Sequence, residues 1–385
     1  MKHTEFAVFL AIVLVIYFLI NLLIFYKVRQ SLSGTGWIKT VVLSVLALSV
    51  LSYPVGRFVE ASASGWISRW MIYIGSVYFG IMVYAFLMVL LTEAIGLLNR
   101  WIHFLPPGTT RNAQRGHQTV ALAIVFGTVL YGYVNDRVLR IRTLDLHIDK
   151  PSAARQEIHM AAVSDLHLGI MMNRSRLEKI VEKINALNPD IVLLVGDLVD
   201  EDAFGNASTE LTGILRSIRS VNGVYAVTGN HEYYAGIEKA AAFMKASNIA
   251  LLQDTVVTTS DGVCLVGRKD ATADHMGEGR IPLTVLTRSC DRRLPVVLMN
   301  HQPFRLEESE QNGIDFQISG HTHHGQMFPF NLITNAVYEK SWGYLKKGKT
   351  QYYVSCGAGT WGPPIRIGSV PEIVEIRLRI GSSSQ

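Results

Sequence analysis

Residues 6–26 contain no charged side chain, and Asn21 is their only strongly polar member. A helix needs about 20 apolar residues to cross a bilayer, so this run predicts a membrane-spanning helix. Residues 71–92 form a second uncharged run. A signal peptide does not explain the first run, because the stretch is too long, lacks a small-residue cleavage site and precedes further apolar runs. The first part of the chain is therefore predicted to lie in a lipid bilayer.

Two weaker runs extend this prediction. Residues 37–55 contain Lys39 and Pro54, and residues 119–134 form a run of only 16 residues. A buried or interfacial helix is the alternative for each of them. We predict four spans within an α-helical membrane domain over residues 1–135.

Charge is distributed unevenly along the chain. Residues 1–150 hold 13 Lys and Arg against 6 Asp and Glu, whereas the remaining residues hold 23 against 25. The basic balance therefore belongs to the first part. The second part shows no basic patch with interleaved aromatic residues, so no nucleic-acid partner is expected.

The cysteines are three in number and have no C-x-x-C spacing; they are Cys264, Cys290 and Cys356. An odd number at such spacing predicts no disulfide framework. We expect at least two of them to be small buried hydrophobic residues.

Five short polar clusters stand out in the second part of the chain. They are Asp165-Leu166-His167, Gly196-Asp197, Gly229-Asn230-His231-Glu232, His301 and Gly320-His321-Thr322-His323. Four of them come within two residues of a short apolar run, at residues 160–163, 191–195, 224–227 and 296–299. The fifth follows the mixed run 314–319. Such runs predict buried strands, whose ends converge at one edge of a sheet.

The side chains of these clusters suit a metal site for hydrolysis. Carboxylate, imidazole and amide groups without a nearby cysteine favour divalent ions such as Mn, Fe, Zn or Ni. An Asp shared by two ions about 3.5–4 Å apart lets both act on one phosphoryl displacement.

At these residues the chain resembles the calcineurin-like metallophosphoesterases, in the membrane-associated branch that includes YkuE-like and YaeI-like proteins. The pattern is D-x-H, G-D-x-x-D, G-N-H-[DE], a later His, and G-H-x-H, and the resemblance covers residues 157–380. It implies an α/β/β/α sandwich of two sheets flanked by helices.

The resemblance also implies site residues and two divalent metal ions as cofactors. One metal would be held by Asp165, His167, Asp197 and His323. The other would be held by Asp197, Asn230, His301 and His321, with Asp197 as the bridge. His231 would be catalytic, contacting the substrate phosphate and assisting the leaving oxygen. Two positions depart from the pattern, because His324 stands where Gly often follows and Cys356 stands where Arg is usual.

Several neighbouring residues have more than one interpretation. Asp165 and His167 would share one face if their strand continued. We expect Asp200 to have a structural role, capping a helix or binding a backbone amide. Glu232 is consistent with either a pocket or a surface loop, and His324 with either a substrate contact or a solvated loop.

The remaining pattern predicts the other elements. Alternation over residues 137–150 indicates a strand that leaves the membrane and joins the catalytic sheet. Helices are predicted at 174–187, 208–218 and 237–246, and strands at 254–259, 263–266, 352–354 and 373–380. Residues 136–156 would connect the two domains, 157–380 would form the catalytic domain, and 381–385 a tail.

Together these features predict a membrane-anchored phosphoesterase that uses two metals to hydrolyse phosphate mono- or diesters, lipid-linked esters included. The alternative is a membrane scaffold that keeps the fold without the chemistry, but every expected ligand type is present.

The resemblance implies a multi-pass protein of the bacterial inner membrane. Basic residues favour the cytoplasmic side, and six flank the two loops opposite the catalytic domain: Lys27, Arg29, Lys39, Arg100, Arg111 and Arg115. Lys2, Arg57 and Arg69 lie on the same side of the membrane as the catalytic domain. The catalytic domain is therefore expected outside the cytoplasm. When Arg137, Arg140 and Arg142 are counted as well, the two sides have equal numbers of basic residues.

Overall fold

A computed structural model describes residues 3–32, 36–104, 111–150, 155–204 and 208–381 of the chain. The chain forms two compact units. One comprises Met1–Val134 with Gly362–Ile365, and the other comprises Asn135–Trp361 with Arg366–Gln385. We call them the helical unit and the catalytic unit.

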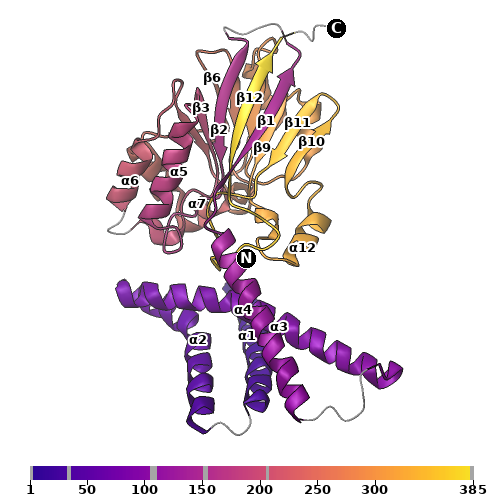
Figure 1. Cartoon of the computed structure of the whole chain (residues 1–385). Helices are drawn as coiled ribbons and strands as arrows, with labels where there is room; N and C mark the ends of the chain where they lie inside the picture. Colours follow the sequence, from indigo (N-terminus) through magenta and orange to yellow (C-terminus); the bar gives the residue numbers. More distant parts are fainter. Residues whose placement is uncertain (1–2, 33–35, 105–110, 151–154, 205–207, 382–385) are drawn as a thin grey trace. The chain divides into compact units, whose positions relative to one another are not determined.

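The helical unit consists of α-helices (Figure 1): α1 (His3–Ser31), α2 (Gly36–Ser62), α3 (Trp66–Ile102) and α4 (Arg111–Asn135). Within the described residues, α1, α2 and α3 are long and apolar enough to cross a membrane, and they contain three of the four predicted spans. The apolar part of α4, Thr119–Asn135, is shorter. A fourth span there stays a prediction.

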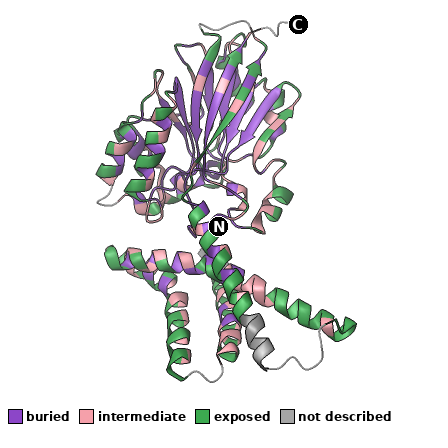
Figure 2. Cartoon of the chain, viewed as in Figure 1, coloured by how far each residue is buried: buried purple, intermediate pink, exposed green. Residues whose placement is uncertain are grey.

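Burial in the helical unit is inverted relative to a water-soluble protein. Large apolar side chains such as Leu19, Leu48 and Leu90 are exposed. Exposed residues are frequent along the helices of this unit in Figure 2. The polar Asn21 is instead buried, and its amide donates to the backbone oxygen of Tyr17 at 2.8 Å. Apolar side chains outside and a satisfied polar group inside are typical of helices surrounded by lipid.

The catalytic unit contains two six-stranded sheets. The first has the order β1-β12-β2-β3-β4-β5, with β1 (Arg140–Ile148), β12 (Glu372–Ile380), β2 (Glu157–Val163), β3 (Ile191–Val195), β4 (Val224–Val227) and β5 (Ala250–Leu251). Its strands β2 to β5 are parallel, while β12 runs antiparallel to β2 and parallel to β1.

The second sheet has the order β10-β11-β9-β8-β7-β6. Its strands are β10 (Gly343–Lys347), β11 (Thr350–Val354), β9 (Phe316–Ser319), β8 (Val296–Met299), β7 (Cys264–Gly267) and β6 (Thr255–Thr258). The four central strands are parallel, and β10 and β6 pair antiparallel at the two edges.

Alternating side chains place the sheets face to face. Along β2, Met160 and Ala162 pack between the sheets with Val297 and Phe316, because successive side chains of a strand point to opposite faces. Ala161 and Val163 point the other way, into a core formed with helices. Both faces of the sheet are therefore buried, as expected for its central parallel strands.

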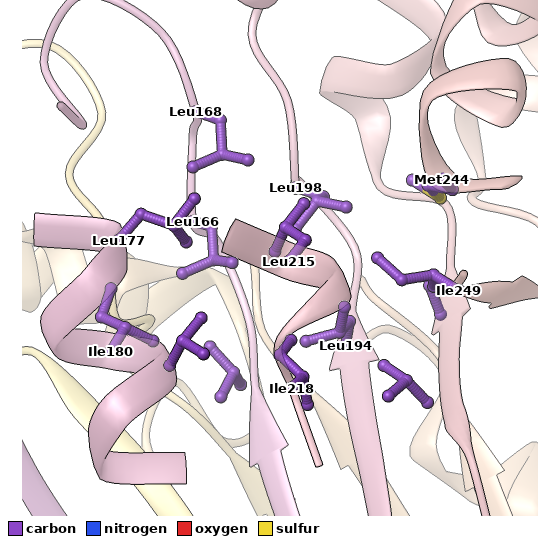
Figure 3. Packing of buried hydrophobic residues seen from close by; sticks show 14 of the residues in the cluster. Leu166, Leu168, Leu177, Ile180, Leu194, Leu198, Leu215, Ile218, Met244 and Ile249 are labelled. Carbon is purple, nitrogen blue, oxygen red and sulfur yellow. The ribbon is translucent and has the colours of Figure 1, made fainter. Parts of the chain in front are cut away.

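Helices cover the outer faces of the two sheets. On the first sheet these are α5 (Arg174–Ala186), α6 (Ser208–Arg216) and α8 (Ile237–Ala246), and on the second sheet α10 (Leu283–Leu286). The catalytic unit also contains α7 (Asn230–Ala235), α9 (Thr272–His275), α11 (Leu306–Gln311) and α12 (Phe330–Val337), with 3₁₀ turns η1 (Glu201–Ala203), η2 (Thr287–Ser289) and η3 (His323–Gly325). Figure 3 shows Leu177 and Ile180 of α5 beside Leu166, in the cluster that also contains Leu194 of β3. Leu283 and Leu286 of α10 pack on the second sheet. The predicted α/β/β/α sandwich is thus confirmed.

The predicted elements agree closely with the observed ones. The strands at 191–195, 224–227 and 296–299 and the helix at 237–246 are found with the same bounds. The strand predicted over 137–150 is β1, which joins the first sheet beside β12. The helices α7, α9, α10, α11 and α12 and the strands β5 and β10 were not predicted.

The prediction of no disulfide is wrong. Cys264 and Cys290 are paired, with their Cα atoms 6.0 Å apart, although 26 positions separate them in sequence. Cys264 begins β7 and Cys290 follows η2, so the fold brings together two residues whose spacing carries no signal. Cys356 is a buried free cysteine.

Candidate metal centre

All seven predicted metal ligands lie just beyond the carboxyl ends of strands, with Asn230 at the start of α7 and His323 at the start of η3. Asp165 follows β2, Asp197 follows β3 and Asn230 follows β4 in the first sheet. His301 follows β8, and His321 and His323 follow β9 in the second sheet. Because parallel strands end at one edge, these segments from both sheets meet there.

The first group of ligands comprises Asp165, His167 and His323, all buried. The Nε2 atoms of His167 and His323 lie 3.1 Å apart. The Nε2 atom of His323 lies 3.5 Å from Asp165 Oδ1. Three donor atoms this close suit one cation.

The second group comprises Asp197, His301 and His321. Oδ2 of Asp197 lies 3.1 Å from His301 Nε2 and 3.9 Å from His167 Nε2. Asp197 therefore reaches ligands of both groups. This position is the one that a bridging carboxylate requires.

Several ligand atoms are buried without a hydrogen-bond partner. In the part of the chain that the structure describes, these include Asp165 Oδ2, Asn230 Oδ1 and His321 Nδ1. An unsatisfied polar atom costs about 1–3 kcal/mol when it is buried. Oxygen and imidazole nitrogen atoms that lack hydrogen-bond partners are gathered at this site, and such atoms are suitable ligands for divalent cations. The residues present therefore suit the metals that the sequence implies.

The backbone around the centre is unusual. Five of the seven ligands have positive φ angles: Asp165 (54°), His167 (48°), Asp197 (50°), His321 (71°) and His323 (45°). Such angles are uncommon outside glycine and cluster at functional sites. The strand β2 ends at Val163, so Asp165 and His167 do not share a strand face as the sequence suggested. Left-handed turns bring their side chains together instead.

Glycine allows two of these loops to approach each other. A Cβ atom at Gly229 would collide with the Asp197 carboxylate. Only glycine therefore fits where the segment after β4 passes Asp197.

Glu232 holds the backbone around Asp197 and Gly229 in place through hydrogen bonds. Its carboxylate is fully buried and accepts backbone N–H groups from Asp197 (3.0 Å), Leu198 (2.7 Å), Val199 (3.1 Å) and Gly229 (2.6 Å). Of the two interpretations open for Glu232, the surface loop is wrong, because the side chain points inward and fixes the backbone.

Asp200 joins two histidines. Its Oδ1 lies 2.8 Å from His167 Nδ1 and 2.8 Å from His231 Nδ1. It makes no side-chain capping bond at η1, so the expected capping role is wrong. Burial alone would raise the pKa of Asp200, but His167 and His231 outweigh it and lower that pKa to about 2. Burial alone would lower the pKa of His167, but Asp200 above all raises it to about 9.

His231 lies beside the first group of ligands. Its ring centroid is 4.6 Å from that of His167, and its backbone N–H donates to Asp197 Oδ1 at 2.9 Å. Trp361 and Tyr234 contact its ring edge-on at 6.2 and 5.6 Å. His231 is partly exposed, as is His321, whereas the other ligands are buried, and it is held at the edge of the centre.

Arg366 is a residue of the centre that the sequence did not single out. Its guanidinium is fully buried, donates to the oxygens of Gly359 (2.6 Å) and Cys356 (2.9 Å), and lies 3.2 Å from His323 Nδ1. Arg366 therefore places a guanidinium beside Cys356, the position at which the family pattern usually has an arginine. In the sequence, the only feature that pointed toward Arg366 was the Gly- and Pro-rich stretch that precedes it.

His324 is half-buried and lies outside the two ligand groups. Its Nδ1 lies 2.8 Å from the Ser341 hydroxyl, and its ring is 5.3 Å from Trp342. The solvated-loop interpretation is wrong for this residue, because its ring is packed.

Comparison with known proteins identifies relatives with the same domain. The calcineurin-like phosphoesterase family matches residues 158–325. An uncharacterized metallophosphoesterase of Helicobacter pylori is 34% identical over 62% of this chain and 64% of its own length. A transmembrane protein with metallophosphoesterase domain from Danio rerio is 30% identical over 89% of this chain and 80% of its own.

A third relative belongs to the branch indicated by the sequence. The uncharacterized metallophosphoesterase YkuE of Bacillus subtilis is 27% identical over 56% of this chain and 77% of its own length. The chain spans less than two thirds of the Helicobacter relative, but four fifths of the Danio rerio one. With its two sheets and five loop clusters, the chain belongs to the calcineurin-like phosphoesterase family.

Proposed function

We propose that this protein is a membrane-anchored phosphoesterase that holds two divalent metal ions. Asp165, His167, Asp197 and His323 would hold one ion, and Asp197, Asn230, His301 and His321 the other. The observation that carries the proposal is the position of Asp197, whose Oδ2 lies within 4 Å of histidines from both groups. The unpartnered buried atoms of Asp165, Asn230 and His321 support the same assignment.

The metals, when bound, supply an activated water and stabilise charge on the phosphoryl oxygens. The protein's own residues prepare the site around them. Backbone N–H groups of His231 and His321 fix the carboxylates of Asp197 and Asp165, each at 2.9 Å. His231 is oriented by Asp200 and is open enough to contact a substrate phosphate. It would donate a proton to the leaving oxygen.

The proposed substrates are phosphate mono- or diesters, with lipid-linked esters as the favoured class. Support comes from the helical unit, since a bilayer anchor raises the local concentration of lipid-linked phosphates. The open side of His231, bordered by Trp361 and Tyr234, also offers apolar surface next to the reacting group.

We further propose a multi-pass protein of the bacterial inner membrane, with residues 1–135 as its membrane domain. Residues 157–380 would form the catalytic domain on the extracytoplasmic side. The basic residues near the spans support this orientation. The Cys264–Cys290 pair adds to it, because disulfides persist in oxidising compartments.

The test uses the full chain, purified in detergent, stripped by a chelator and reloaded with Mn, Fe, Zn or Ni in turn. Hydrolysis of aryl phosphomonoesters, aryl phosphodiesters and lipid diphosphates is then measured beside metal content. Restored hydrolysis together with two metals per chain supports the proposal. Full metal loading without hydrolysis of any substrate would instead show a scaffold.

A further inference from the structure

The helix α12 presents an apolar face to its surroundings. Leu332, Ile333 and Val337 are 59, 59 and 57% exposed, and no residue of α12 is buried. Figure 2 shows this helix, placed by its label in Figure 1, without a buried residue. Residues 325–338 also carry no charge. Exposed apolar patches of this kind mark interaction surfaces.

The same face continues into exposed aromatic side chains. Phe328 precedes α12 and is 50% exposed, and Phe304 is 44% exposed. Phe304 stacks at 4.7 Å on Tyr338, the residue that follows α12. We call Phe304, Phe328, Leu332, Ile333 and Val337 the apolar rim.

The apolar rim is attached to the metal centre. Helix α12 begins five residues after η3, which carries the ligand His323. Tyr338 lies 6.2 Å, ring to ring, from the ligand His321. Whatever covers the rim is therefore adjacent to the place where a substrate would bind.

Amphipathic and charged side chains flank the rim, where Glu339 is paired with Lys347. Ser341 contacts Asn335 of α12 and so ties the neighbouring Lys340 and Trp342 to that helix. The guanidinium of Arg142 lies 5.5 Å from the Trp342 ring. An apolar helix face bordered by Trp, Lys and Arg is typical of helices that lie in the headgroup region of a bilayer.

We propose that α12 docks on the lipid surface of the bilayer in which the chain is anchored, so that the metal centre acts on phosphoesters at headgroup level. The bilayer is the occupant that the chain itself supplies, because the same polypeptide contains three helices able to cross it. Residues 136–139 join α4 to β1. Because this connection is short, lipid is present at a high effective concentration for the catalytic unit. Part of the inference, the substrate class, rests on the proposed function, whereas docking itself does not.

The docking test uses the full chain in phosphatidylcholine–phosphatidylglycerol vesicles. Ile333→Cys carries a fluorescent label, and Val221→Cys, at a 75% exposed loop position, is the matched control. The native cysteines are paired or buried and do not compete. We expect a nitroxide lipid to quench the label at 333 and aqueous iodide to quench the label at 221.

Two outcomes would overturn docking. Equal access of iodide to both labels would show that α12 stays in water. Protection from iodide without quenching by the lipid, together with cross-linking between copies, would show that a second chain covers the face.

A kinetic test follows from the same geometry. The double variant Leu332→Glu, Ile333→Glu should hydrolyse a soluble aryl phosphodiester at the wild-type rate, because neither residue contacts the metal centre. Hydrolysis of a phospholipid in vesicles should fall on the order of tenfold, since acidic side chains oppose insertion. Val221→Glu should change neither rate. Equal losses on both substrates would contradict the surface role, and absence of all activity in the wild type would count against the proposed hydrolase alone.

Discussion

The carboxylate of Glu232 accepts the backbone N–H of Asp197 at 3.0 Å, so a buried acid holds the loop that carries the proposed bridge. Three more backbone N–H groups point at the same carboxylate. The acid thus fixes the backbone that carries the proposed ligand Asp197.

Glu232→Gln should weaken metal binding, because the amide keeps one acceptor oxygen and turns an N–H₂ group toward backbone donors. We expect a loss of about 10–100-fold in metal affinity, the usual range for groups that orient ligands. Titration of the metal-stripped protein with Zn measures it. Glu238→Gln, at an exposed position of α8, is the control, and wild-type affinity in the Glu232 variant would contradict the role.

Asp197→Asn should abolish hydrolysis of an aryl phosphodiester and lower bound metal more than His323→Ala does, since the bridge serves both ions. Metal analysis of the purified variants provides the measurement. The exposed Asp149→Asn serves as the matched control. Wild-type metal content in the Asp197 variant would refute its assignment as the bridge.

His231→Ala should keep its metals yet lose rate on the order of 10²–10⁴-fold, the range for one acid–base group. The loss should shrink for substrates with a good leaving group, which need less protonation. His275→Ala, an exposed histidine, controls for the substitution itself. If metal content falls together with the rate, His231 is a ligand instead.

Asp200 should stabilise the metal-free protein within a defined pH window. Its pKa is lowered to about 2, so its contribution is present above its unfolded value near 4 and is lost as pH falls toward 2. The pKa of His167 is raised to about 9, so the contribution of its charge is complete below about 6.5 and is lost as pH rises through 9.

The difference in melting temperature between wild type and Asp200→Asn, measured with chelator present, should therefore be greatest between about pH 4 and 6.5. A difference independent of pH would show that the two groups are not paired as charges.

The orientation of the catalytic unit can be tested by fusion. Alkaline phosphatase joined after Lys150 should be active, because this reporter needs an oxidising compartment. An inactive fusion, together with an active cytoplasmic reporter at the same point, would place the catalytic unit in the cytoplasm.

Sequence reasoning located the strands and the polar clusters that follow them because both leave local signals. A run such as 191–195 is apolar at every position, and polar residues follow it at once. Contacts between distant segments leave no such signal. Arg366 reaches His323 from 43 positions away, and Cys264 meets Cys290 only because the second sheet brings them together. The capping role expected for Asp200 was wrong, since its side-chain partners are His167 and His231, which follow two other strands.

The apolar face of α12 was also missed, for a different reason. Residues 330–337 alternate apolar and small polar groups over barely two helical turns, too few to separate a buried helix from an exposed one. Only the exposed area of each side chain distinguishes the two.

The place of β12 in the first sheet bears on how the protein is made. Strand β1 reaches the rest of the sheet only through β12, with which it pairs from Arg140 to Ile148. The ribosome must therefore synthesise residues 149–371, which separate the two strands, before β1 finds its neighbour. Helix insertion comes first and closure of the sheet last, so a premature stop before residue 372 would leave an anchored chain with two unpaired strand edges and a target for membrane proteases.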